Sequence, residues 1–216
     1  IELEPQEPAP WLRRALDRLA AEGLVVHHGH WRIAGRPQVL LVEHEVGLDA
    51  LNALKHRTWV NHGIGLPPSD PFIDPVLSFA DATRRLLWAI EEAWCREGDD
   101  DDESAPPERR LLAQFHEWMG GLAIPMIRHD EAAKAALALA RAPIAITFTT
   151  HATQLGRAIA YNDERMYEHM ASFDHAVEAA RYDLVAKHSI ERACAFGADC
   201  FTTVSPITAE ECTALL

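Results

Sequence analysis

The chain has 216 residues, 48% of them hydrophobic, which is enough length and apolar content to bury one core without disulfide staples. It contains no run of about 18 uncharged apolar residues, no basic export signal and no CxxC pair among its four cysteines, so we expect a soluble cytoplasmic protein with no membrane partner. The net charge of −13 and the lack of a basic patch argue against nucleic acid as the main partner.

The first half of the chain predicts one helix, two strands and two further helices. Apolar residues recur at helical spacing from Pro10, a good first-turn residue, to the helix-stopping Gly23. Short β-rich runs follow, and helical spacing then returns on both sides of a proline-rich loop at residues 63–75. The predicted helices are residues 10–23, 48–59 and 76–94, and the predicted strands are residues 24–26 and 39–42.

An acidic segment at residues 97–108 divides the chain. It holds seven acids and no base, and it includes Pro106 and Pro107. Such a run repels itself and cannot bury apolar area, so it predicts a solvated, mobile loop. A carboxylate metal site is the alternative interpretation.

After this segment, short apolar strands alternate with long helices. Strands are predicted at residues 111–115, 144–149 and 200–204, and residues 181–196 are predicted to form the longest helix. Ser205 as cap and Pro206 in the first turn predict the start of a last helix. This order is typical of an α/β fold with a Rossmann-like parallel sheet flanked by helices.

Ligands of such sheets bind at the carboxyl ends of the strands, which selects three places. His116 and Glu117 follow the first strand, Thr150 and His151 the second, and Ser205 the third. An imidazole at 151 can hydrogen-bond a sugar hydroxyl, and a guanidinium six residues later, at Arg157, can bind phosphate oxygens. The alternative is that His151 bonds a loop carbonyl and Arg157 pairs with a surface acid.

Several segments resemble motifs of the glycogen synthase family. Residues 150–157, THATQLGR, resemble its THATLLGR motif, with Gln154 in place of a leucine. Residues 115–118 (FHEW), 190–193 (IERA) and 201–208 (FTTVSPIT) resemble further family segments in the same order. Upstream, GHWRIAG at residues 29–35 and IGLP at residues 64–67 extend the resemblance over nearly the whole chain.

The resemblance implies roles for particular residues. In that family the histidine and the arginine of the THATLLGR motif contact the UDP-glucose donor, so the resemblance predicts that His151 and Arg157 bind UDP-glucose. His116, Glu117 and Thr150 are further candidates for the same cleft, although Glu117 could equally be a first-turn acid favoured by a helix dipole. Glu191 and Arg192 are predicted to be a structural ion pair.

The family's activity is a retaining transfer of glucose from UDP-glucose to the non-reducing end of an α-1,4-glucan. The resemblance implies that residues 1–216 are the N-terminal lobe of a two-lobe enzyme of the GT-B type, incomplete at both ends. The second lobe would supply the cations for the leaving UDP, so we expect this chain alone to be inactive. No cofactor is implied, and a homo-oligomer is possible.

The histidine-rich run at residues 27–30 could be interpreted as a set of metal ligands, but we predict no metal site. His27, His28 and His30 lie where the family has Tyr, Phe and Arg, and the later histidines lack the i, i+4 pairing of a helix-borne zinc site. An Ala-rich helical insert is predicted at residues 131–141.

Two alternative functions stay open: another two-lobe nucleotide-sugar glycosyltransferase, or a non-catalytic carbohydrate- or protein-interaction domain of the same fold.

Overall fold

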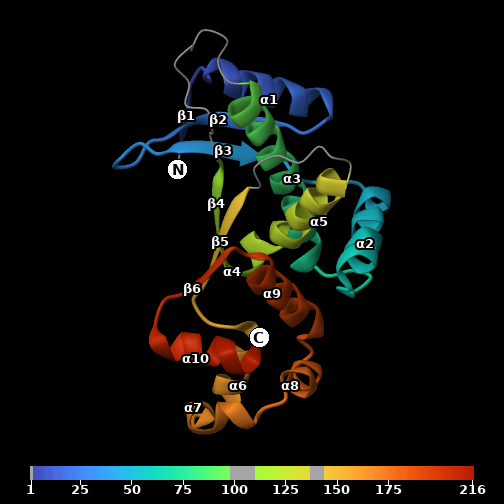
Figure 1. Ribbon diagram of the computed structural model, residues 1–216, viewed down its shortest axis with the longest axis vertical. Coiled ribbons are helices and arrows are strands. Elements are labelled where there is room, and N and C mark those ends of the chain that lie inside the picture. Colours follow the sequence, from blue (N-terminus) through green and yellow to red (C-terminus); the bar gives the residue numbers. More distant parts are fainter. Residues whose placement is uncertain (1, 98–109, 137–143) are drawn as a thin grey trace.

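The structure is a computed structural model that describes residues 2–97, 110–136 and 144–216 (Figure 1). The described strands form two separate three-stranded sheets. The antiparallel sheet has the order β1-β2-β3, and the parallel sheet has the order β4-β5-β6. The strands are β1 (Leu3–Pro5), β2 (Val26–Trp31), β3 (Gln38–Val42), β4 (Leu112–His116), β5 (Ala145–Thr150) and β6 (Cys200–Thr203).

Helices pack against both sheets. The antiparallel sheet and α1 lie at one end of the molecule, and α6, α7, α8 and α10 lie at the other end, with the parallel sheet between them (Figure 1). The helices are α1 (Pro10–Ala21), α2 (Leu48–His62), α3 (Ile73–Ile90), the π-helix η1 (Glu91–Glu97), α4 (Glu117–Gly121), α5 (Ala123–Ala136), α6 (Gln154–Asn162), α7 (Met166–His169), the short 3-10 helix η2 (Met170–Ser172), α8 (His175–Arg181), α9 (Val185–Gly197) and α10 (Pro206–Leu215). The predicted α/β architecture with a parallel sheet flanked by helices is confirmed.

The helix α3 joins two hydrophobic cores. Its buried Leu77 belongs to the core between the parallel sheet and its helices, which also contains the fully buried Ile146 and Phe148 of β5. Its Leu86 lies on another face of the helix and packs in a second core with Leu19 of α1. A single helix with two apolar faces thereby connects the antiparallel end to the parallel sheet.

The first strand, β1, was not predicted. Its acidic, proline-containing sequence shows little strand preference, but its backbone pairs with β2 in the register Leu3 to Trp31 and Pro5 to Gly29. Gly29 permits this approach, because a Cβ there would overlap the backbone carbonyl of Glu4. The strand therefore depends on a partner more than twenty residues away in the sequence.

The boundaries of α3 differ from the prediction of residues 76–94. The side chain of Asp70 accepts hydrogen bonds of 2.8 Å from the backbone N–H groups of Phe72 and Ile73, and the helix begins at Ile73. Pro75 stands in the first turn, where it has no N–H to lose. At the other end the backbone passes into η1 at Glu91.

The helix predicted at residues 181–196 is present as α9 but begins later, at Val185, because the chain breaks between α8 and α9. Asp183 has the left-handed φ of 56°, and Leu184 N–H donates to the Ala179 carbonyl at 2.8 Å, which ends α8. Among the described residues the longest helix is instead α3, with 18 residues. Gly197 does end α9, as predicted.

Two further predictions fall largely outside the described residues. Of the acidic segment at residues 97–108, only Glu97 is described, as the last residue of η1. Of the predicted insert at residues 131–141, the described part continues α5 as far as Ala136. None of the helices in the described ranges is long and apolar enough to cross a membrane.

Candidate functional site

The carboxyl ends of the three parallel strands meet at one edge of the sheet. His116 at the end of β4 is in register with Thr149, and Thr150 at the end of β5 is in register with Thr203 of β6. The hydroxyl groups of Thr149 and Thr202 lie 2.7 Å apart across this edge. The polar residues that follow these strands therefore gather in one place.

Glu117 joins His151 to Arg157. Its Oε1 accepts a hydrogen bond of 3.0 Å from the backbone N–H of His151 and one of 3.4 Å from Nη2 of Arg157. Arg157 is 54% exposed and Glu117 is 22% exposed, so the guanidinium keeps donors that face the solvent. The two predicted donor-binding residues are thus held by one carboxylate oxygen.

The backbone of Glu117 is strained. Its φ of 59° lies in the left-handed region, which a residue with a side chain enters at a cost of about 1–3 kcal/mol. This turn comes directly after His116, at the step from β4 into α4. Strain of this kind persists where the surrounding structure fixes the residue, and here it places the carboxylate toward the loop after β5.

The two other cleft candidates lie differently. The ring of His116 is exposed and meets the ring of His151 edge-to-face, with centroids 6.0 Å apart. Thr150 is fully buried, and its hydroxyl donates to the Ala152 carbonyl at 3.3 Å. The structure therefore brings His116 to His151 at the surface and keeps the side chain of Thr150 beneath it.

The loop after β5 is anchored by two buried glutamates that sequence reasoning missed as site residues. Thr153 caps α6 by accepting from Gly156 N–H at 2.8 Å. Its own N–H and hydroxyl donate to Glu211 Oε1 at 2.7 and 2.8 Å. Gln154 N–H donates to Glu191 Oε2 at 2.9 Å. These carboxylates satisfy N–H groups at the start of α6 that would otherwise lack acceptors.

Gly156 is required by this arrangement, because a Cβ there would overlap the carboxylate of Glu211. The sequence gives little sign of Glu211, which follows Glu210 and looks like a surface acid on a helix. The predicted ion pair of Glu191 with Arg192 is wrong: Glu191 is fully buried against Gln154, and Nη1 of Arg192 lies 3.4 Å from Nε2 of His175.

Burial raises the pKa of Glu191 to about 8. The hydrogen bond from Gln154 N–H opposes this rise, the charges of Glu117 and Glu211 add to it, and Arg157 opposes it. Glu191 Oε1 has no hydrogen-bond partner within the described residues. Near neutral pH this carboxyl group is therefore largely protonated, beneath the turn that carries His151.

Ser205 caps the last helix as predicted. Its side-chain oxygen accepts from Thr208 N–H at 3.2 Å, and Pro206 is the first residue of α10. This cap fixes the start of the helix that carries Glu211.

The histidines of β2 have ordinary partners. His27 pairs with Glu43 at 2.8 Å, and His28 and His30 bond the backbone carbonyls of Gln6 and Arg36. In the part of the chain that the structure describes, no three His, Cys, Asp or Glu residues are grouped so that they could hold a metal ion.

A Rossmann-like sheet flanked by helices, with polar residues gathered where its strands end, is the plan of a lobe of the GT-B class. The chain belongs to the glycogen synthase family, whose family model matches residues 1–216. The family expected from the sequence motifs is thereby confirmed.

Curated relatives support the same assignment. The chain is 30% identical over 217 residues to a glycogen [starch] synthase of Neurospora crassa and 33% identical over 211 residues to the liver glycogen [starch] synthase of Rattus norvegicus. It is 31% identical over 213 residues to glycogen [starch] synthase isoform 1 of Saccharomyces cerevisiae. These matches cover 97% to 100% of the chain but only 27% to 28% of each relative, in its N-terminal part.

Proposed function

We propose that the protein takes part in the transfer of glucose from UDP-glucose to the non-reducing end of an α-1,4-glucan, with retention of configuration. His151 contacts the glucose, and Arg157 contacts the phosphate side of the donor. The observation that carries this proposal is the shared hydrogen bonding of His151 N–H and Arg157 to Glu117 Oε1 at the carboxyl edge of the sheet.

The chemistry of these groups suits a nucleotide sugar. During transfer, the bond from the anomeric carbon to the UDP oxygen breaks and negative charge grows on the phosphate. A guanidinium offers five N–H donors in a plane, so Arg157 can bond Glu117 on one side and phosphate oxygens on another. An imidazole can donate to or accept from a sugar hydroxyl, and a fixed loop backbone holds it in position.

Glu117 acts as the positioning residue in this proposal. Its carboxylate touches the loop and the guanidinium from the end of the neighbouring strand, and the buried Glu211 and Glu191 hold the same loop from below. Preorganised donors stabilise developing charge without reorganising during the reaction. A second lobe of the family's two-lobe enzymes is the proposed source of the remaining cations.

The test is UDP-glucose binding to the variants His151→Ala and Arg157→Ala, measured by calorimetry. Loss of a hydrogen bond that involves a charged group predicts a fall in affinity of about tenfold or more for Arg157→Ala, and a smaller fall for His151→Ala. The matched controls are His56→Ala and Arg165→Ala, which change exposed residues on α2 and beside α7. Undiminished affinity in both site variants would overturn the proposal.

A further inference from the structure

Three glutamates from three different helices hold one turn of the backbone, residues 151–154, between β5 and α6. Each accepts a hydrogen bond from a different N–H group of this turn, at 2.7, 2.9 or 3.0 Å. The pairs are Glu117 with His151, Glu211 with Thr153 and Glu191 with Gln154. Glu117, Glu191 and Glu211 thus form a glutamate cradle for the turn. Because like charges repel, three carboxylates gathered at one turn are costly to keep ionised together.

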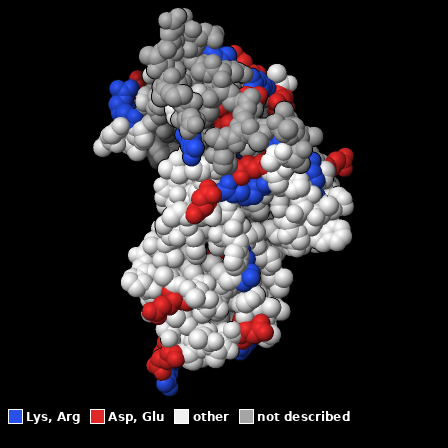
Figure 2. Space-filling model, viewed as in Figure 1, with Lys and Arg blue, Asp and Glu red and all other residues white. Residues whose placement is uncertain are grey.

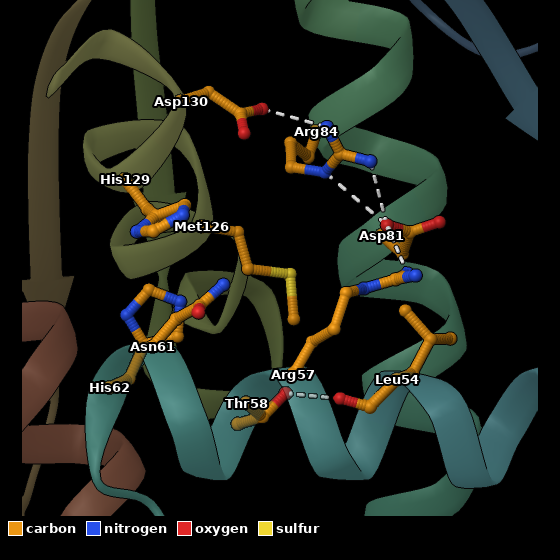
Figure 3. A pocket seen from close by; sticks show the side chains of 10 residues that line it. All are labelled: Leu54, Arg57, Thr58, Asn61, His62, Asp81, Arg84, Met126, His129 and Asp130. Atoms are coloured by element: carbon orange, nitrogen blue, oxygen red, sulfur yellow. Dashed lines mark hydrogen bonds and ion pairs between the residues drawn. The ribbon is translucent and has the colours of Figure 1, made fainter. Parts of the chain in front are cut away.

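The acids between α2, α3 and α5 show the usual alternative, in which each carboxylate has a cation. Figure 3 shows Asp81 of α3 facing the guanidinium groups of Arg57 and Arg84, and Asp130 of α5 bonded to Arg84 at 2.7 Å. The glutamate cradle lacks this balance. Of its three carboxylates, only the one at the end of β4 has a salt-bridge partner among the described residues, which is Arg157 at 3.4 Å.

The three carboxylates differ in how well their charge is compensated. Glu211 accepts three hydrogen bonds, at 2.7, 2.8 and 3.2 Å. Glu117 is 22% exposed and has a cationic partner. Glu191 is fully buried, accepts one hydrogen bond through Oε2, and its Oε1 has no partner within the described residues. A buried charge with a single donor is the most costly of the three, so the geometry assigns a proton to Glu191.

The pKa of Glu191 agrees with this assignment. Burial raises it to about 8, and the charges of Glu117 and Glu211 act in the same direction. The hydrogen bond from Gln154 N–H and the charge of Arg157 oppose the rise. The neutral form is therefore the main form at pH 7.

Other titratable groups around α9 do not compete for this proton near pH 8. Burial raises the pKa values of the thiols of Cys194 and Cys212, the latter to about 12, and that of the Tyr167 hydroxyl. On two further helices packed against α9, His175 of α8 and Arg128 of α5 have partners away from the cradle. A change in protonation between pH 7 and pH 9 at this turn is thus assigned to the buried glutamate of α9.

We propose that Glu191 is a positioning residue that must carry a proton for the donor site to bind UDP-glucose. The neutral acid accepts from the turn and leaves the guanidinium of Arg157 to the donor phosphates. The ionised acid would attract Arg157 toward the cradle, repel Glu117 and oppose the negative charge of the donor. This inference rests on the proposed donor site and adds a protonation step to it.

Protonation and donor binding are then linked. The apparent affinity for UDP-glucose follows the protonated fraction of Glu191, so it is full well below pH 8 and falls as the pH rises through about 8. Between pH 7 and pH 9 the fall should be about three- to tenfold. The linkage is reciprocal, so donor binding at pH 8 should take up a fraction of a proton from the buffer.

The experiment is a calorimetric titration of the protein with UDP-glucose at pH 7, 8 and 9, repeated at pH 8 in two buffers of different ionisation enthalpy. The parent protein should show the fall in affinity and a heat difference between the buffers that reports proton uptake. Glu191→Gln keeps an acceptor for Gln154 N–H without a titratable proton, so it should hold its pH 7 affinity to pH 9 and take up no proton. The matched control is Glu210→Gln, which removes an exposed carboxylate on α10 and should behave as the parent does.

Three results would overturn the proposal. One is a parent protein whose affinity is the same from pH 7 to pH 9 with no proton uptake, a measurement that needs no variant. Another is an equal fall in affinity in the parent and in Glu191→Gln, both folded by circular dichroism. The third is a loss of affinity in Glu191→Gln already at pH 7. In each case UDP-glucose still binds the parent, so the donor site stands, whereas no binding at any pH would remove the donor proposal itself.

Discussion

The two ends of the molecule use their carboxylates in opposite ways. At the parallel sheet, Glu191 and Glu211 are buried and accept hydrogen bonds from the backbone at the start of α6. At the antiparallel sheet, Glu2, Glu4 and Glu43 are exposed to at least 43% and pair with Arg or His side chains at the surface. The buried glutamates hold the backbone of a candidate site in place, whereas the exposed glutamates only form ion pairs on the surface of a sheet.

The exposed charges on one face of the molecule are scattered. On the face in Figure 2, Lys and Arg side chains stand apart from one another, several beside Asp or Glu, and do not form one continuous basic area. Exposed pairs of this kind contribute little to stability. The difference between the two ends can be tested by removing acids from each.

The largest effect is expected for Glu211→Ala. Its loss leaves the N–H of Thr153 and the hydroxyl of Tyr167, 3.2 Å from Glu211 Oε2, without their acceptor. The free energy of unfolding should fall by about 3 kcal/mol, measured by urea denaturation. The exposed neighbour is the control: Glu210→Ala should change it by about 0.5 kcal/mol or less, and equal losses would contradict the account.

Glu191→Gln should remove a pH dependence. The pKa of Glu191 is about 8 in the fold, against 4.5 as its ordinary value. Its contribution to stability is therefore full below pH 4.5 and is lost as the pH rises to 8, with a slope of up to about 1.4 kcal/mol per pH unit. Denaturation between pH 6.5 and 8 should show a shallower slope in the variant; an unchanged slope would refute this role.

His188 should act in the acid range. It is buried on α9, and burial, with the charges of His175 and Arg192, lowers its pKa from 6.5 to about 4. A lowered pKa means that stability is full above pH 6.5 and is lost as the pH falls toward 4. His188→Gln should lessen that loss between pH 6.5 and 5, and thermal melts in which both proteins lose stability equally would count against it.

The smallest effect is expected at the antiparallel sheet. Arg32 and Glu2 form a 2.8 Å pair with 58% and 77% of their side chains exposed. Arg32→Ala should lower the free energy of unfolding by about 0.5 kcal/mol or less, and the difference should shrink in high salt. A loss as large as that of Glu211→Ala would erase the contrast between the two ends.

Local features of the fold could be predicted from the sequence, and distant contacts could not. The Ser205 cap, the stop at Gly197 and the alternation of strands with helices depend on neighbouring residues. The break at Asp183 depends on a single left-handed residue that no glycine marks. The strand β1 forms through backbone pairing with β2, which its own sequence does not indicate.

The site shows the same limit. Motif resemblance selected His151, Arg157, His116 and Glu117, and the structure brings all four to one edge. Glu211 reaches Thr153 across 58 positions of the chain, and nothing near either residue predicts the contact. The donor-binding roles, the cytoplasmic location, the oligomeric state and the inactivity of this chain alone stay predictions.

The most direct test of the central claim is a double-mutant cycle on UDP-glucose affinity. It combines Glu117→Gln, which keeps an acceptor for His151 N–H but removes the charge, with Arg157→Ala. The account predicts that Glu117→Gln weakens binding in the parent protein and changes it little once Arg157 is gone, because the carboxylate acts by positioning the guanidinium. The same loss in both backgrounds would contradict it.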